Sequence, residues 1–103
     1  MRIKVKAKHI KEGKQCSTKT CPVALALRDA GYQHIEVGSD TVEVKMRKGK
    51  RVDCFTGALP ARAVRFIDKF DRANETDRKK MIRQFKPFEF TLKLKPDDWD
   101  VIN

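Results

Sequence analysis

Residues Thr20–Gly31 have the sequence Thr-Cys-Pro-Val-Ala-Leu-Ala-Leu-Arg-Asp-Ala-Gly, which predicts a buried helix with both ends marked. Pro22 suits the first helical position, because the N–H that proline lacks would have no partner there. Cys21 or Thr20 is then the capping residue, and Gly31 ends the helix in a left-handed conformation. The apolar residues between these ends leave little of the helix for water. A helix of this kind needs a sheet to cover, and the flanking segments have strand patterns.

Before this helix, Ile3, Val5 and Ala7 alternate with charged residues and predict a half-buried strand over residues 2–8. Residues 9–13 follow as a short turn that places an isoleucine inward and ends at a glycine. The outer face of the strand is wholly cationic, and its residues are Arg2, Lys4, Lys6 and Lys8.

After the helix, three runs of alternating residues predict an antiparallel meander over residues 32–37, 41–47 and 51–55. The sequences Gly-Ser-Asp and Lys-Gly-Lys between these runs are typical of hairpin turns. A last strand is predicted over residues 88–95, where phenylalanine and leucine alternate strictly with polar residues. Lys93 and Lys95 lie on its outer face.

A second helix begins near Pro60, and its apolar face has helical spacing. Residues 73–86 are compatible with a third helix that starts at Thr76, or with a mobile loop. The order β-α-β-β-β-α-(α)-β predicts an α+β fold, a two-layer sandwich with helices on one face of a mostly antiparallel sheet. We expect one domain over residues 1–95 and an acidic tail over residues 96–103.

The composition favours a polyanionic partner. Of 103 residues, 24 are Lys or Arg and 14 are Asp or Glu, which gives a net charge of +10. Such an excess attracts nucleic acid, although it also serves solubility alone. No apolar run approaches the roughly 20 residues of a membrane span, and no signal peptide is evident. The odd number of cysteines, 3, excludes a complete disulfide framework and favours a reduced, cytoplasmic setting.

Metal binding and catalysis have weak support in the sequence. Cys16 and Cys21 form one loosely spaced pair, and no second pair completes a zinc site. Cys21 at a helix N-terminus has either a lowered thiol pKa or only a capping role. The carboxylates form no catalytic set, and no phosphate-binding loop is present. We therefore expect no enzyme, no metal and no cofactor.

The cationic residues give the most coherent prediction of function. If the first and last strands pair, their outer faces form one basic plate that holds phosphates with little sequence preference. Exposed aromatics are few, which disfavours base stacking. The predicted nucleic-acid-binding residues are Arg2, Lys4, Lys6, Lys8, Lys93 and Lys95 on the strands, with Arg62, Arg65 and Lys69 on the second helix.

Three stretches resemble those of small uncharacterised proteins of bacteriophages and prophages. They are His9–Leu27, through His9-Ile10, Gly13, Cys16 and Cys21–Leu27, then Phe66–Asp71 and Pro87–Phe90. Members of that family share a Cys-Pro-hydrophobic-Ala-Leu-Ala helix, a Phe-Ile-x-x-Phe-Asp helix and a closing Pro-Phe-x-Phe strand. The resemblance implies a phage-encoded accessory protein in the bacterial cytoplasm, and it carries no catalytic residues.

Three functions follow from these observations. The first is non-enzymatic nucleic-acid binding through the cationic faces. The second is inhibition of a host defence or transcription protein. The third is capture of an anionic nucleotide by Arg47, Arg62 or Arg65.

Overall fold

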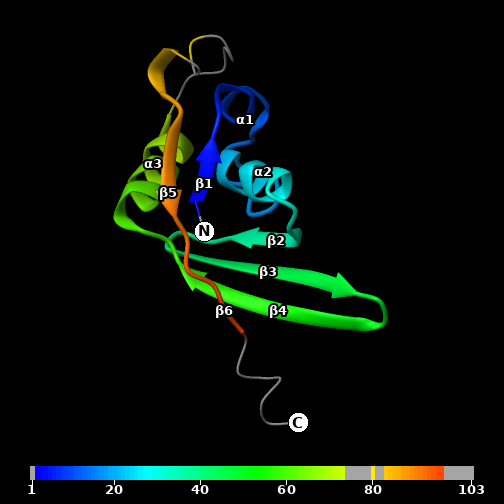
Figure 1. Cartoon of the computed structure of the whole chain (residues 1–103). Helices are drawn as coiled ribbons and strands as arrows, with labels where there is room; N and C mark the ends of the chain where they lie inside the picture. Colours follow the sequence, from blue (N-terminus) through cyan, green and yellow to red (C-terminus); the bar gives the residue numbers. More distant parts are fainter. Residues whose placement is uncertain (1, 74–79, 81–82, 97–103) are drawn as a thin grey trace.

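The computed structural model describes residues 2–73, 80 and 83–96, and it confirms the predicted α+β class (Figure 1). The strands form two antiparallel sheets, of two and four strands. The elements in chain order are β1 (Arg2–Val5), α1 (Ala7–Glu12), α2 (Pro22–Asp29), β2 (Gln33–Val37), β3 (Thr41–Lys48), β4 (Arg51–Ala58), α3 (Ala61–Arg72), β5 (Phe88–Thr91) and β6 (Lys95–Pro96).

The first strand, β1, is a neighbour of β5, which is the pairing that the predicted basic plate requires. β1 and β5 pair antiparallel, with Ile3 opposite Phe90 and Val5 opposite Phe88. The second sheet has the order β2-β3-β4-β6, so the predicted meander is confirmed within it. In Figure 1 the β1–β5 pair lies among the helices, and the four-stranded sheet lies below it. The strands are thus divided between two sheets, whereas the sequence pattern was interpreted as one.

Helix α2 forms where the sequence placed it. Pro22 is its first residue, and the Cys21 thiol caps it by accepting a hydrogen bond from the Ala24 N–H at 3.4 Å. Gly31 follows the helix with a φ of +105°, a conformation that glycine adopts at little cost. Leu27 is fully buried, and α2 contacts α1, β1 and β2.

The N-terminal strand is shorter than predicted. It ends at Val5, and Lys8 lies on helix α1 instead of on the strand face. His9 and Ile10 are adjacent in sequence and both buried, which an alternating strand does not allow but a helical turn does. The Lys6 N–H donates to Nδ1 of His9 at 2.9 Å and closes the start of this turn.

Helix α3 packs on the β1–β5 pair through phenylalanines. The Phe66 ring lies 4.7 Å from Phe88 and 5.7 Å from Phe85, measured between ring centroids. At the C-terminal end of α3, the Gln15 side-chain amide donates to the carbonyl oxygens of Phe70 and Ala73 at 2.7 and 2.6 Å. The α1–α2 loop therefore caps the C-terminal end of α3.

The predicted continuous strand over residues 88–95 is wrong. After Thr91 the chain leaves β1, crosses to the second sheet and pairs with β4 as β6. Gly57 on β4 permits this crossing, because a Cβ there would lie 2.6 Å from the Lys93 carbonyl oxygen. Lys93 and Lys95 consequently lie beyond the β1–β5 pair.

Two predictions fall mainly outside the described residues. They are the third helix from Thr76 and the acidic tail over residues 96–103. Phe85, in the same segment, is described and buried.

Replacing Gly57 by alanine is expected to destabilise the fold by about 1–3 kcal/mol, the usual range for forcing extra atoms into a packed site. The obstacle is the backbone carbonyl of Lys93, which cannot move without shifting the crossing segment. Thermal melting measures the effect. Gly38→Ala is the matched control, because its Cβ would be no closer than 3.4 Å to another atom. Equal melting temperatures for the two variants would contradict the proposed role of Gly57.

Candidate nucleic-acid interface

The outer face of the β1–β5 pair carries charged residues that the strand register brings together. Lys4 lies opposite Glu89, and Arg2 lies opposite Thr91. All four residues are exposed, because the alternate positions of both strands point into the core. The Arg2 Nε is 3.4 Å from the Glu89 carboxylate, so the one acidic residue among these four already has a cationic neighbour.

Arg62 joins this face from helix α3. Its guanidinium donates to the backbone carbonyl oxygen of Glu89 at 3.3 Å. A depression of about 340 Å³ lies between α3 and the strands, and Arg2, Pro60, Arg62, Glu89 and Thr91 are among its lining residues. Two arginines from distant parts of the chain therefore line one hollow.

A second depression of about 610 Å³ adjoins the first. Lys93 and Lys95 line it, and it shares Pro60 and Thr91 with the first depression. The hydroxyl-bearing residues Thr41, Thr56 and Thr91 also line it. The two hollows and the exposed Lys4 opposite Glu89 form one cationic strip along β5 and the crossing segment, which we call the β5 surface. Its residues are Arg2, Lys4, Arg62, Lys93 and Lys95.

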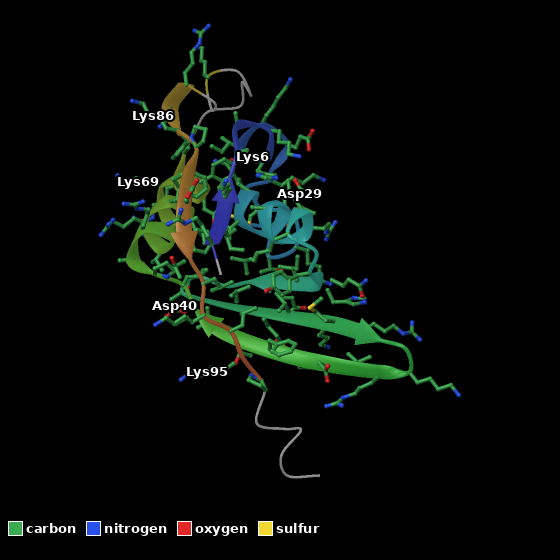
Figure 2. The ribbon with its side chains drawn as sticks, in the orientation of Figure 1. Lys6, Asp29, Asp40, Lys69, Lys86 and Lys95 are labelled. Atoms are coloured by element: carbon green, nitrogen blue, oxygen red, sulfur yellow. The ribbon has the colours of Figure 1, made fainter. Side chains whose placement is uncertain are left out.

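Arg65 and Lys69 extend the cationic character along helix α3. With Arg62 they occupy positions i, i+3 and i+7, which align on one side of a helix, and all three are exposed. Figure 2 shows the Lys69 side chain pointing outward from α3, on the side of the molecule opposite Asp29. These two residues continue the stripe that begins at Arg62.

Lys8 is not part of this surface, which corrects the prediction that it shares a face with Lys4. Its ammonium group is 2.9 Å from the carboxylate of Asp29 at the end of α2. Lys6 remains exposed, between β1 and α1. The predicted plate of six strand cations is therefore replaced by a strip that Arg62 completes.

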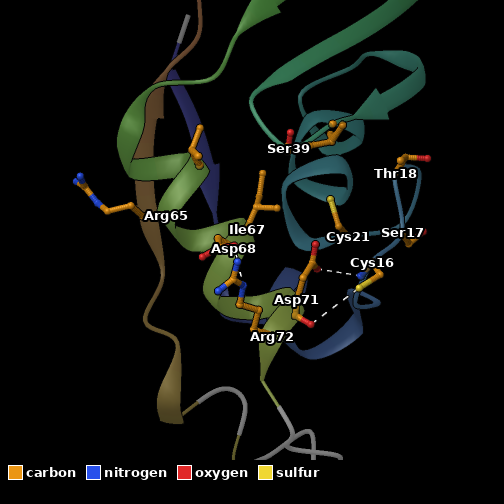
Figure 3. Close-up of a pocket in the computed structure, with 13 residues that line it drawn as sticks. Cys16, Ser17, Thr18, Cys21, Ser39, Arg65, Ile67, Asp68, Asp71 and Arg72 are labelled. Atoms are coloured by element: carbon orange, nitrogen blue, oxygen red, sulfur yellow. Dashed lines mark hydrogen bonds and ion pairs between the residues drawn. The ribbon is translucent and has the colours of Figure 1, made fainter.

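The two cysteines of the sequence pair line a different hollow, of about 540 Å³, between the α1–α2 loop and α3 (Figure 3). The Cys16 N–H donates to the Asp71 carboxylate at 2.9 Å. Burial raises the pKa of the Cys21 thiol and outweighs the backbone N–H groups of Ala24 and Val23, which lower it, so the helix start does not lower this pKa overall. Arg65 points away from the hollow, and Arg72 is held by Asp68 at 3.0 Å.

Within the described residues, no group of three or more histidine, cysteine or acidic side chains is placed to hold a metal ion. No described helix is both long enough and apolar enough to cross a membrane.

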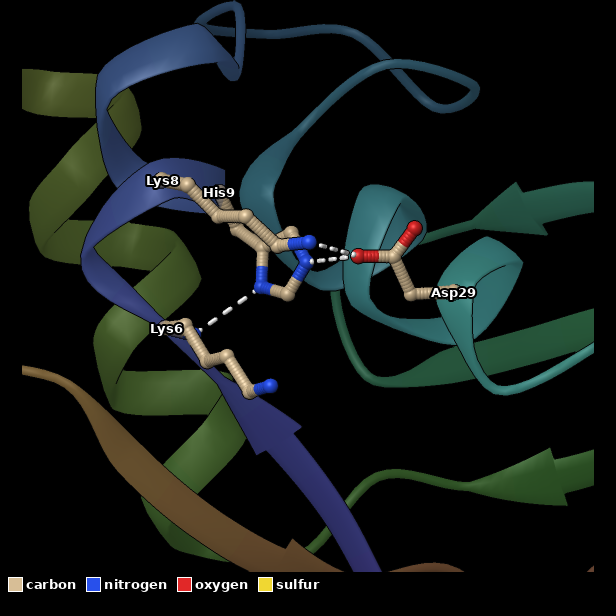
Figure 4. Close-up of polar contacts among 4 residues, drawn as sticks. All are labelled: Lys6, Lys8, His9 and Asp29. Atoms are coloured by element: carbon tan, nitrogen blue, oxygen red, sulfur yellow. Dashed lines mark hydrogen bonds and ion pairs between the residues drawn. The ribbon is translucent and has the colours of Figure 1, made fainter.

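A buried histidine links α1 to α2, and the sequence pattern did not reveal it (Figure 4). His9 accepts the Lys6 N–H at Nδ1, so its proton resides on Nε2, which donates to Asp29 at 2.6 Å. The hydrogen bonds from His9 and then Lys8 lower the pKa of Asp29 from 3.8 to about 2. Since both ring nitrogens are engaged, this His–Asp pair holds two helices together and has no nitrogen left to take a proton from a substrate.

Comparison of the chain with protein-family models, with curated proteins and with solved structures found no match. The arrangement of the charged side chains therefore carries the functional argument.

The hydrogen bond between His9 and Asp29 predicts how the stability of the protein changes in acid. A carboxyl whose pKa is lowered by folding stabilises the protein at pH values above its ordinary pKa, which is 3.8 for Asp29. This contribution is lost as the pH falls toward the pKa in the folded protein, about 2. Asp29→Asn should therefore lower the melting temperature at pH 7, and the difference from the wild type should shrink between about pH 4 and pH 2. Asp40→Asn, in an exposed turn, is the control. A difference that stays constant with pH would contradict the role of Asp29.

Proposed function

We propose that this protein binds nucleic acid through the β5 surface and has no catalytic activity. The supporting observation is the convergence of β1, β5, the crossing segment and the start of α3 on one strip. This convergence places Arg2, Lys4 and Arg62 around Glu89, and Lys93 and Lys95 at the adjoining depression. A cationic strip of this kind matches a phosphate backbone in charge.

The groups on the strip suit phosphate oxygens. Guanidinium groups bind phosphate through two parallel N–H donors, and ammonium groups act as point charges. The threonine hydroxyls in the larger depression add neutral donors beside Lys93 and Lys95. Hydroxyl and backbone donors of this type position a protein on a nucleic acid without reading its bases.

The aromatic residues in the described part of the chain give no support for base recognition by this surface. Phe90 is buried, and Phe66 and Phe88 pack against each other. Base stacking requires exposed aromatic faces. We therefore infer that the β5 surface contributes affinity through phosphate contacts, and that this contribution varies little with sequence. A phage-type accessory role fits this activity.

The salt dependence of binding tests the proposal. Four or five phosphate contacts by the β5 surface contribute about −3.6 to −4.5 to the slope of log K against log salt on duplex DNA. Lys4→Gln combined with Lys93→Gln should make this slope shallower by about 1.8 and weaken binding to all sequences alike. Both side chains are exposed, so the fold should be retained.

The matched control is Lys14→Gln combined with Lys19→Gln, which removes the same charge from the exposed α1–α2 loop. If only net charge mattered, both double variants would bind nucleic acid equally weakly. This result would contradict the proposed role of the β5 surface. Absence of any electrophoretic shift of duplex or single strands at low salt would reject nucleic-acid binding. Recovery of one stoichiometric protein from a nuclease-treated bacterial lysate would then favour the inhibitor function.

A further inference from the structure

The hairpin of β3 and β4 extends beyond the sheet to which it belongs. The pairing with β2 reaches no further along β3 than Lys45, and β6 pairs only with Phe55 and Thr56 of β4. Within the described chain, residues 46–53 therefore form a ribbon of two strands with no third strand on either edge. Figure 1 shows this end of the hairpin projecting past β2, away from the helices. We call residues 46–53 the free ribbon.

One face of the free ribbon combines positive charge with an apolar side chain. Arg47 lies opposite Val52 in the register, and the adjacent pair on this face is Lys45 with Cys54. Val52 is 49% exposed and is the most exposed large apolar side chain among the described residues. The Arg47 Nε donates to the Gly49 carbonyl oxygen at 3.3 Å, which holds the guanidinium near the turn.

The acidic residue of the free ribbon lies on the other face. Asp53 is opposite Met46, and its carboxylate is 2.9 Å from the Nε of Arg51. The carboxylate is thus neutralised within the ribbon and kept away from the face with Arg47 and Val52. Lys50, in the exposed turn, adds a further cation at the end.

We propose that the free ribbon enters the major groove of double-stranded DNA, with Arg47 and Val52 facing the base edges. This inference rests on the proposed nucleic-acid binding and adds a second contact element. The major groove of B-form DNA accepts a two-stranded ribbon, whereas that of A-form RNA is too deep and narrow for side chains to read. Arginine donates to guanine O6 and N7, and an apolar side chain packs on the thymine methyl group. Lys45 and Lys50 flank this pair and contact the phosphates along the groove.

Dimethyl sulfate tests the groove directly, because it methylates guanine N7 in the major groove and adenine N3 in the minor groove. On a short DNA duplex saturated with protein, guanine N7 should be protected and adenine N3 should stay reactive. Arg47→Gln combined with Lys50→Gln should abolish the N7 protection and weaken DNA binding about 10-fold or more. Binding to an RNA duplex, which uses only the β5 surface, should stay unchanged. The double variant Lys14→Gln/Lys19→Gln should retain the protection.

The outcomes separate this inference from the proposed function. DNA binding could be weakened in Lys4→Gln/Lys93→Gln and unchanged in Arg47→Gln/Lys50→Gln. This outcome would support the proposed function and overturn the ribbon contact. Protection of adenine N3 with guanine N7 left reactive would also overturn it. Absence of any DNA binding by the wild-type protein would reject both. Melting curves that match the wild type establish that the ribbon variant is folded.

Discussion

Burial of helix α2 is the constraint on which the other elements depend. Its apolar residues Val23, Ala24 and Leu27 are fully enclosed, and the helix contacts α1, β1 and β2 at once. Burying large aliphatic side chains is worth roughly 1.5–3 kcal/mol each, so an arrangement that exposes this helix loses several kcal/mol of stability. The start of α2 also fixes its neighbour. A Cβ at Gly13 would lie 2.5 Å from Pro22, so α1 ends directly against the first turn of α2.

This packing explains why the strands divide into two sheets. The α2 helix lies against β1 and β2, which belong to different sheets, and it thereby closes the space between them. The last part of the chain contributes to both sheets, first as β5 beside β1 and then as β6 beside β4. The crossing between them carries Lys93 to the second depression while Arg2 and Arg62 stay at the first. The shape of the candidate interface is thus a consequence of how the core is covered.

The distribution of acidic groups decides which cations are available to a ligand. Asp29 holds Lys8, Asp68 holds Arg72 and Asp53 holds Arg51, each within 3.0 Å. Pairs of this kind on the surface contribute little to stability, but they do cancel charge locally. Among the described residues, Glu89 is the one acidic residue that lines the two depressions of the β5 surface, and on the free ribbon Asp53 lies on the face opposite Arg47 and Val52. Both places therefore combine several cations with little opposing charge.

The sequence by itself determined the features that depend on neighbours in the chain. Pro22 and Gly31 each act on the helical turn next to them, so the two ends of α2 were predictable. The hairpins and the outward position of Lys4 were predictable for the same reason, because they depend on residues close in the sequence. Tertiary structure alone decided that Lys8 leaves the strand, because that depends on the burial of His9 against Asp29 from another helix. It also decided that Lys93 joins Arg62, because the crossing requires the absence of a side chain at Gly57 on a distant strand. Alternation predicts which side a residue faces, but it does not predict where a strand stops. That limit depends on contacts between residues far apart in the sequence.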